Sequence, residues 1–281
     1  MKAIPLLAVV ALTIVAVSCS NGPTPPQPGS PAFLWNAARE TYRGGDLLKT
    51  NDNLSEIVQT ENDFTAKARA WQIVVSAGLS QGLAALATGY EAGAKANRAN
   101  PMPFRKQATD LRTMAGRAAL DLTQAVHDFA ARNQSPDVLL AFDFPAGSLT
   151  QPGSLQKIYS GMLMQDSETI ALRTAMEQRG VVLALCQIAG SPEDSAKVLE
   201  KFKAGEVKIP RATFLFGAAK VLYDDSDVFT SNKLDQPQRL KAMYDQALDA
   251  LHAVPESQDT KDLTAKLQAA VKKMLKKSGG V

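Results

Sequence analysis

Few of the residues that most often carry catalysis or metal binding occur in this sequence. Its 281 residues include 2 cysteines, which excludes a small domain held together by several disulfides. The 2 histidines, His127 and His252, stand alone, and no His-Glu-x-x-His or paired-cysteine motif occurs. No P-loop or dinucleotide-binding glycine pattern is present. We therefore expect no metal site, no cofactor and no enzymatic activity.

An excess of charge of one sign is also missing. The 31 basic residues are nearly matched by 28 acidic ones, so the formal net charge is only +3. This balance argues against a nucleic-acid-binding protein. Hydrophobic residues make up 45% and charged residues 21% of the chain, which is the composition of a globular protein with a real core. An intrinsically disordered chain is therefore excluded.

The N-terminus is organised like a secretory signal. Lys2 supplies a positive charge, and an apolar stretch follows from Leu6 to Val17. This stretch is shorter than the roughly 20 residues that a transmembrane helix needs. Residues 20–31 are rich in proline and glycine, which favours an extended tether over a helix.

Between the signal and the tether, Ala16-Val17-Ser18-Cys19 resembles the lipobox of bacterial lipoproteins. The resemblance implies cleavage before Cys19 and acylation of its thiol, with palmitate or a similar chain at the new N-terminus. Ala16 stands where the lipobox favours leucine. Ser20, which is not aspartate, implies the outer membrane by the sorting rule of enteric bacteria. An ordinary signal peptide with an incidental Cys19 is the alternative.

The rest of the chain has the apolar period of helices. One stripe runs from Phe64 to Tyr90 and a second from Phe104 to Phe129, with two shorter stripes after Pro237. No comparable set of alternating strand patterns occurs. We therefore predict an all-α fold of about ten helices. The stretch from Val138 to Gly153 is expected to be irregular and to pack on the bundle surface or in a groove.

A helical repeat is suggested by one turn. Tyr42-Arg43-Gly44-Gly45-Asp46-Leu47 resembles the Tyr-x-x-Gly-Asp turn of the tetratricopeptide repeat (TPR), in which the aromatic packs between helices and the glycine ends the first helix. The resemblance implies a TPR-like α-α superhelix. The predicted helices 64–95 and 104–133 are longer than those of this repeat, so a repeat-like helical bundle is the other architecture expected. The chain then divides into a signal peptide (1–18), a lipid-anchored tether (19–31) and one all-helical domain (32–281).

One motif points to catalysis. Gly78-Leu79-Ser80-Gln81-Gly82 matches the G-x-S-x-G nucleophile elbow of serine hydrolases, with His127 or His252 as a possible base. That elbow requires a strand followed by a sharp turn, whereas the apolar stripe runs through both glycines as one helix. The glycines are then expected to let a neighbouring helix approach, and Ser80 is expected to lie away from the apolar face.

Other polar or reactive groups have simpler interpretations. Cys186 lies in an apolar helical run and is expected to be a buried structural residue. His127-Asp128 is expected to face solvent. The cluster 224–227 is expected to be a solvated acidic turn, with incidental cation binding as the alternative. The C-terminal lysines are interpreted as a solvated helix face, with contact to anionic lipid or an acidic partner as the alternative: Lys266, Lys272, Lys273, Lys276 and Lys277.

Together these features favour a lipoprotein whose helical domain faces the periplasm from the outer membrane. The partners expected are the bilayer, through acylated Cys19, and an envelope protein or peptide bound by the helical domain during assembly or transport. An accessory protein that binds a small molecule or lipid for a transporter is the alternative, with the Leu139–Phe144 segment helping to enclose a pocket. A serine hydrolase using Ser80 is the remote alternative.

Overall fold

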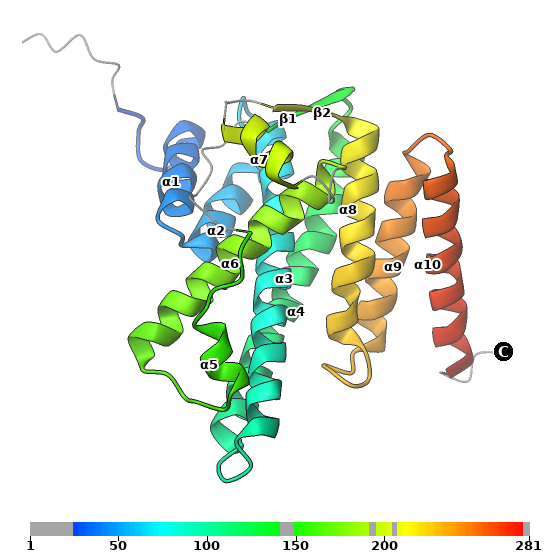
Figure 1. Ribbon diagram of the computed structural model, residues 1–281. Helices are drawn as coiled ribbons and strands as arrows, with labels where there is room; N and C mark the ends of the chain where they lie inside the picture. The colour runs from blue at the N-terminus through cyan, green and yellow to red at the C-terminus, as the bar shows by residue number, and fades with distance from the viewer. Residues whose placement is uncertain (1–24, 141–148, 191–194, 204–206, 278–281) are drawn as a thin grey trace, which may run out of the picture.

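The computed structural model describes residues 25–140, 149–190, 195–203 and 207–277. The predicted signal peptide and Cys19 lie outside the described residues. The described residues confirm an all-α fold of about ten helices, with one 3-10 helix and a single pair of short strands (Figure 1). The helices are α1 (Pro31–Arg43), α2 (Leu47–Ile57), α3 (Thr65–Ala96), α4 (Met102–Arg132), α5 (Leu155–Tyr159), α6 (Asp166–Ile188), α7 (Ser195–Lys203), α8 (Arg211–Asp225), η2 (Ser226–Phe229), α9 (Pro237–His252) and α10 (Gln258–Lys277).

The first two helices form a hairpin through the Tyr-x-x-Gly-Asp turn. Gly44 caps α1, and Gly45 takes a φ of +78°, a conformation that glycine adopts without a steric penalty. The Asp46 side chain then caps α2 by accepting a hydrogen bond from the Lys49 backbone N–H at 3.1 Å. Tyr42 is fully buried, with its ring 5.4 Å from that of Trp71 on α3. The aromatic side chain thus packs between the hairpin and the next helix.

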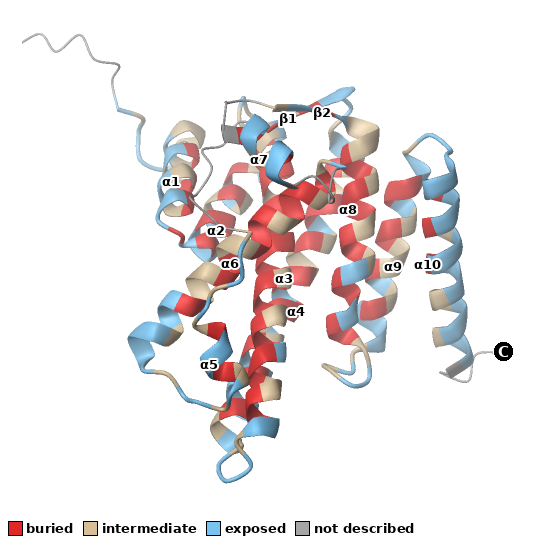
Figure 2. Ribbon diagram, viewed as in Figure 1, coloured by how far each residue is buried: buried red, intermediate tan, exposed pale blue. Residues whose placement is uncertain are grey.

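Helix α3 forms the centre of the molecule. It packs against α2, α4, α5, α6 and α8, and α4 in turn packs against α9 (Figure 1). In a regular solenoid each repeat touches only its neighbours in sequence. Here one helix contacts elements from both halves of the chain, which is the arrangement of a bundle. One contiguous buried core extends from Trp35 on α1 to Leu267 on α10 (Figure 2).

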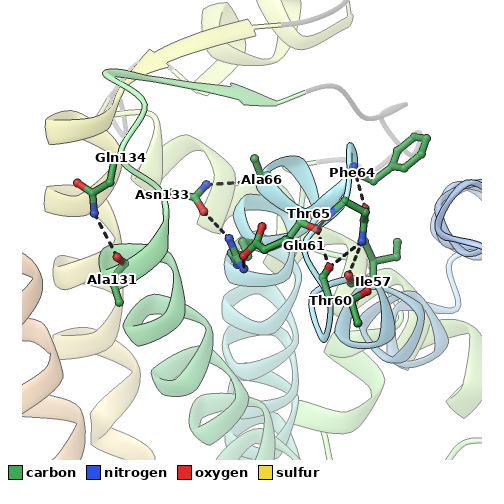
Figure 3. Close-up of polar contacts among 11 residues, drawn as sticks. Ile57, Thr60, Glu61, Phe64, Thr65, Ala66, Ala131, Asn133 and Gln134 are labelled. Carbon is green, nitrogen blue, oxygen red and sulfur yellow. Dashed lines mark hydrogen bonds and ion pairs between the residues drawn. The ribbon is translucent and has the colours of Figure 1, made fainter.

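The start of α3 and the end of α4 are joined by polar contacts (Figure 3). The Asn62 side-chain amide donates to the carbonyls of Ile57 and Thr60, which fixes the turn before α3. Arg69 is only 3% exposed; it forms an ion pair with Glu61 and donates to Asn133 Oδ1 at 3.2 Å. These bonds connect the α2–α3 turn to the C-terminus of α4.

The segment expected to be irregular begins with a strand, so that prediction is wrong at its start. Strand β1 (Asp137–Leu140) pairs antiparallel with β2 (Val207–Pro210), with Val138 opposite Ile209. The strand forms because Val138 and Leu140 alternate with exposed or half-buried neighbours and pack into the core. Residues 141–148 lie outside the described part of the chain.

The C-terminal helices form a second set of hairpins. Helix α9 packs against α8 and α10, while α10 touches α9 and α8 along one edge of the molecule. Figure 1 places α10 on the side opposite to α1, where the N-terminal segment enters. Helix α10 buries Leu263 and Leu267, but most of its later residues are exposed or half-buried (Figure 2).

Among the described helices, only α3 is long and apolar enough to cross a membrane. In the most apolar 18-residue stretch of this helix, 78% is buried inside the protein. The apolar residues of α3 therefore form the core of the bundle.

Candidate functional site

Ser80 lies in the middle of α3 and is 1% exposed. The prediction that it points away from the apolar face is wrong, because α3 is enclosed by other helices on nearly all sides. The helix continues through Gly78 and Gly82 without a strand or a turn, so the geometry of a nucleophile elbow is missing around Ser80.

The two candidate bases have other surroundings. His127 is exposed on α4, as expected, and its Nδ1 lies 3.2 Å from Gln246 Oε1 on α9. His252 is the last residue of α9 and is also exposed. The structure therefore does not place an imidazole where it would activate the Ser80 hydroxyl.

The motif's glycines bring α3 and α6 together, as predicted. A Cβ on Gly78 would lie 2.4 Å from the Val181 backbone N, and one on Gly82 would lie 2.4 Å from the Met176 carbonyl oxygen. On the facing helix, a Cβ on Gly180 would lie 2.0 Å from the Gly78 carbonyl oxygen. The backbones thus cross at a distance that only glycine permits on both sides.

Asp225, at the end of α8, is 8% exposed and interacts with Ser80 and Gln81. Burial raises the pKa of its carboxyl from 3.8 to about 8, against the opposing effect of hydrogen bonds from these two side chains. Within the described chain, its Oδ2 atom has no hydrogen-bond partner. The expectation that residues 224–227 form a solvated acidic turn is therefore wrong for Asp225 and Ser226, which are buried, and right for Asp224 and Asp227.

A chain of side-chain amides extends this buried contact to the surface. Gln81 Nε2 donates to Gln187 Oε1 at 3.3 Å, and Gln187 Nε2 donates to Asp224 Oδ2 at 2.7 Å. Asp224 also raises the pKa of Asp225 through its negative charge. These residues join α3, α6 and α8, so the cluster stabilises the junction of three helices.

A groove of about 500 Å³ lies between the end of α8, η2, α9 and α10. Its walls are mainly apolar and aromatic, and the rings of Tyr223 and Tyr244 lie 5.9 Å apart. The residues that line it are Tyr223, Phe229, Thr230, Ser231, Asp235, Pro237, Leu240, Tyr244, Ala270, Lys273 and Met274. We call this site the α8–α10 groove.

The loop that edges the α8–α10 groove is held by backbone hydrogen bonds. The Leu234 N–H donates to the Val228 carbonyl at 3.1 Å, and the Gln236 N–H donates to the Phe229 carbonyl at 3.0 Å. Asp235 adopts a φ of 50° and donates its N–H to the Thr230 carbonyl at 3.0 Å. The groove is therefore largely preformed, which is typical of binding sites.

The remaining predicted residues have structural positions. Cys186 is 1% exposed in α6, which confirms that it is buried. The lysines Lys266, Lys272, Lys273 and Lys276 are exposed on α10, and the side chain of Lys277 lies outside the described residues. No group of three or more potential metal-binding His, Cys, Asp or Glu side chains occurs in the described ranges.

The sequence did not identify the α8–α10 groove. Its residues come from α8, α9, α10, η2 and the loop between η2 and α9, and aromatic residues such as Tyr223, Phe229 and Tyr244 are also typical of a protein core. The expected pocket segment, Leu139–Phe144, instead begins in strand β1. Comparison with protein-family models, curated proteins and solved structures found no match.

Proposed function

We propose that the chain is an outer-membrane-anchored helical lipoprotein that acts as a protein-binding scaffold in cell-envelope assembly or transport. Acylated Cys19 is the proposed anchor and residues 19–31 are the proposed tether, which leaves the helical domain in the periplasm. The observation that carries the proposal is the α8–α10 groove, on the side of the bundle opposite to the entry of the N-terminal segment (Figure 1).

The proposed occupant of the groove is an apolar segment of an envelope protein. Tyr244, Leu240 and Met274 offer the aromatic and aliphatic contacts that dominate protein interfaces, while Lys273 and Asp235 lie at the edge. The face of α10 that lines the groove supports this assignment. Ala270 and Met274 on that face are half-buried, and a bound partner would cover the rest of their apolar surface.

Site-specific photo-crosslinking in cells tests this assignment. A photoreactive residue replaces Lys273 in the groove or Ala242, which is exposed on α9 outside the groove. We expect position 273 to capture one envelope protein that position 242 does not capture. That protein, once purified, should bind a Tyr244→Ala variant at least about tenfold more weakly, since a central tyrosine contributes about 2 kcal/mol or more. Equal binding by the variant would contradict the assignment.

The volume of the groove favours a second candidate function. A space of about 500 Å³ is within the range of small-molecule sites. On this hypothesis the chain is a periplasmic accessory protein that binds a small molecule or lipid for a transporter. Native mass spectrometry of the purified protein would distinguish the two functions, because a ligand of defined mass should accompany the wild type and be lost from the Tyr244→Ala variant.

A further inference from the structure

A second surface lies at the far end of α3, away from the α8–α10 groove. Helix α3 ends at Ala96 and α4 begins at Met102, and the turn between them projects from the bundle (Figure 1). The loop after α5 lies beside this turn, because Asn97 Nδ2 donates to the Gly161 carbonyl at 3.0 Å. We call these two adjacent segments, residues 95–106 and 160–163, the α3–α4 tip.

Large apolar side chains are exposed at the α3–α4 tip. Met102 is 64% exposed, Met162 is 53% exposed and Leu163 is 51% exposed. Exposed apolar side chains that gather in one place mark an interaction surface, whereas single ones do not. The tip is a projecting end and not a groove, so its shape suits a flat, deformable surface better than a peptide.

Four cations lie on the α3–α4 segment of the tip. Lys95, Arg98, Arg105 and Lys106 are all exposed, and none forms an ion pair with another described residue. Between positions 95 and 110 the sequence offers one acid, Asp110, to balance them. After the 160–163 segment, Asp166 and Glu168 are exposed, and Glu168 pairs with Lys157. Exposed methionine and leucine next to a group of lysines and arginines is a composition that binds the interface of an anionic membrane.

The exposed apolar residues are also unevenly distributed over the molecule. The large ones among the described residues are Phe33, Leu48, Met102, Met162, Leu163, Ile170 and Leu275. All but Leu275 belong to α1, α2, the start of α4 or the α5–α6 region, and Leu275 belongs to α10. Figure 1 shows α1, α5 and the start of α6 on the side where the N-terminal segment enters, with α10 on the other side. An apolar tip and an N-terminal anchor are therefore compatible with one membrane plane.

We propose that the α3–α4 tip is a second membrane contact, in which Met102, Met162 and Leu163 enter the interface of a bilayer whose anionic headgroups bind the lysines and arginines of residues 95–106. The 32 residues of α3 span about 48 Å. The stretch from Cys19 to Ser30 reaches at most about 40 Å. With both contacts made to one membrane, α3 is inclined to the bilayer and the α8–α10 groove faces away from it.

A fluorescent label on the full chain tests this contact. An environment-sensitive dye is attached at Met162→Cys or, as the control, at Leu275→Cys on α10. Both variants also carry Cys19→Ser, so that position 19 neither takes the dye nor anchors the protein, and buried Cys186 stays unlabelled in the folded protein. We expect a blue shift of the dye at position 162 in vesicles of mixed phosphatidylglycerol and phosphatidylcholine, reversed by added salt. Emission at 162 that is the same with and without phosphatidylglycerol, or an equal shift at 275, would overturn the proposal.

Charge variants make the test specific to the α3–α4 tip. Replacing Arg98, Arg105 and Lys106 by glutamine should lower binding to the anionic vesicles at least about tenfold. Replacing Lys266, Lys272 and Lys276 by glutamine removes the same charge from α10 and should leave the shift at position 162 in place. The reverse pattern would assign membrane binding to α10. Failure of either test leaves crosslinking at the groove unaffected, so the two proposals are judged separately.

Discussion

The buried carboxyl of Asp225 makes the stability of the folded protein depend on pH. The unfolded chain releases this proton near the ordinary pKa of 3.8, whereas the folded protein holds it until about 8. Between these values the folded state binds more protons, so its stability falls as the pH rises. Near neutral pH the carboxyl is mostly protonated and acts as a neutral partner of Ser80.

Replacing Asp225 by asparagine should remove this pH dependence. The wild type is expected to lose roughly 1.4 kcal/mol of unfolding free energy from this group for each pH unit between about 4 and 8. The variant keeps the shape and a side-chain oxygen for Ser80 but has no proton to lose. Urea denaturation at several pH values in that window measures both slopes. Glu177 and Asp121, whose pKa values are also raised by burial, keep part of the slope in the variant. An unchanged slope would show that Asp225 ionises normally.

At the scale of elements, the α3–α6 crossing depends on glycines that face each other. Gly78 and Gly82 on α3 meet Gly180 on α6 with their backbones in contact. Such a crossing holds the two helices without large interlocking side chains. It also explains why a G-x-S-x-G sequence occurs in a helix: the glycines serve packing, and the serine between them bonds to the carboxyl of a third helix.

A single methyl group at this crossing should separate the helices. We expect Gly180→Ala to lower the unfolding free energy by about 3 kcal/mol, because its Cβ would lie 2.0 Å from the Gly78 carbonyl oxygen and only backbone movement relieves the clash. Gly153→Ala is the matched control, since a Cβ on Gly153 would meet no other atom within 4 Å. Chemical denaturation measures the unfolding free energy of both variants. Equal values would contradict the prediction, because they would mean that α3 and α6 move apart at the crossing without a loss of stability.

The helices themselves were predictable, since the spacing of apolar residues and the residues that end helices are local properties of the sequence. Residues 64–95 and 104–133 were expected to be helical, and α3 and α4 match those ranges within a few positions. The strand β1 was missed because its three apolar residues, Val138 to Leu140, are too few to show a period that separates a strand from irregular structure. The burial of Ser80 and Asp225 was missed because it depends on which helices surround α3, and no local pattern records that.

At the scale of the whole molecule, the central position of α3 decides between the two predicted architectures. The α1–α2 hairpin has the turn of a helical repeat, but α3 collects contacts from helices about 100 residues later in the chain. The choice between a superhelix and a bundle could not be made from the sequence, because the turn at residues 42–47 favoured a repeat whereas the lengths of helices 64–95 and 104–133 favoured a bundle. The candidate groove depends on the same long-range packing.

The distribution of the protein between membrane and soluble fractions tests the proposed anchor at Cys19. Replacing Cys19 by alanine should move the protein from the membrane fraction to the soluble or uncleaved-precursor fraction, because the proposed acyl chains would contribute most of the free energy of membrane binding. Cell fractionation together with incorporation of labelled palmitate measures this. Cys186→Ala is the control and should stay in the membrane fraction. Palmitate incorporation that persists without Cys19 would exclude the proposed site.

The order in which the molecule folds follows from the position of α3. Contacts between α3 and α6 join residues about 100 positions apart. The contacts that α4 makes with α9 also depend on a much later part of the chain, because α9 ends at His252. These contacts form only when residues from both halves of the chain are present. A repeat array would begin to fold from its first hairpin. We therefore expect this protein to complete its core later than a repeat array would, which is compatible with the proposed export of the unfolded chain across a membrane.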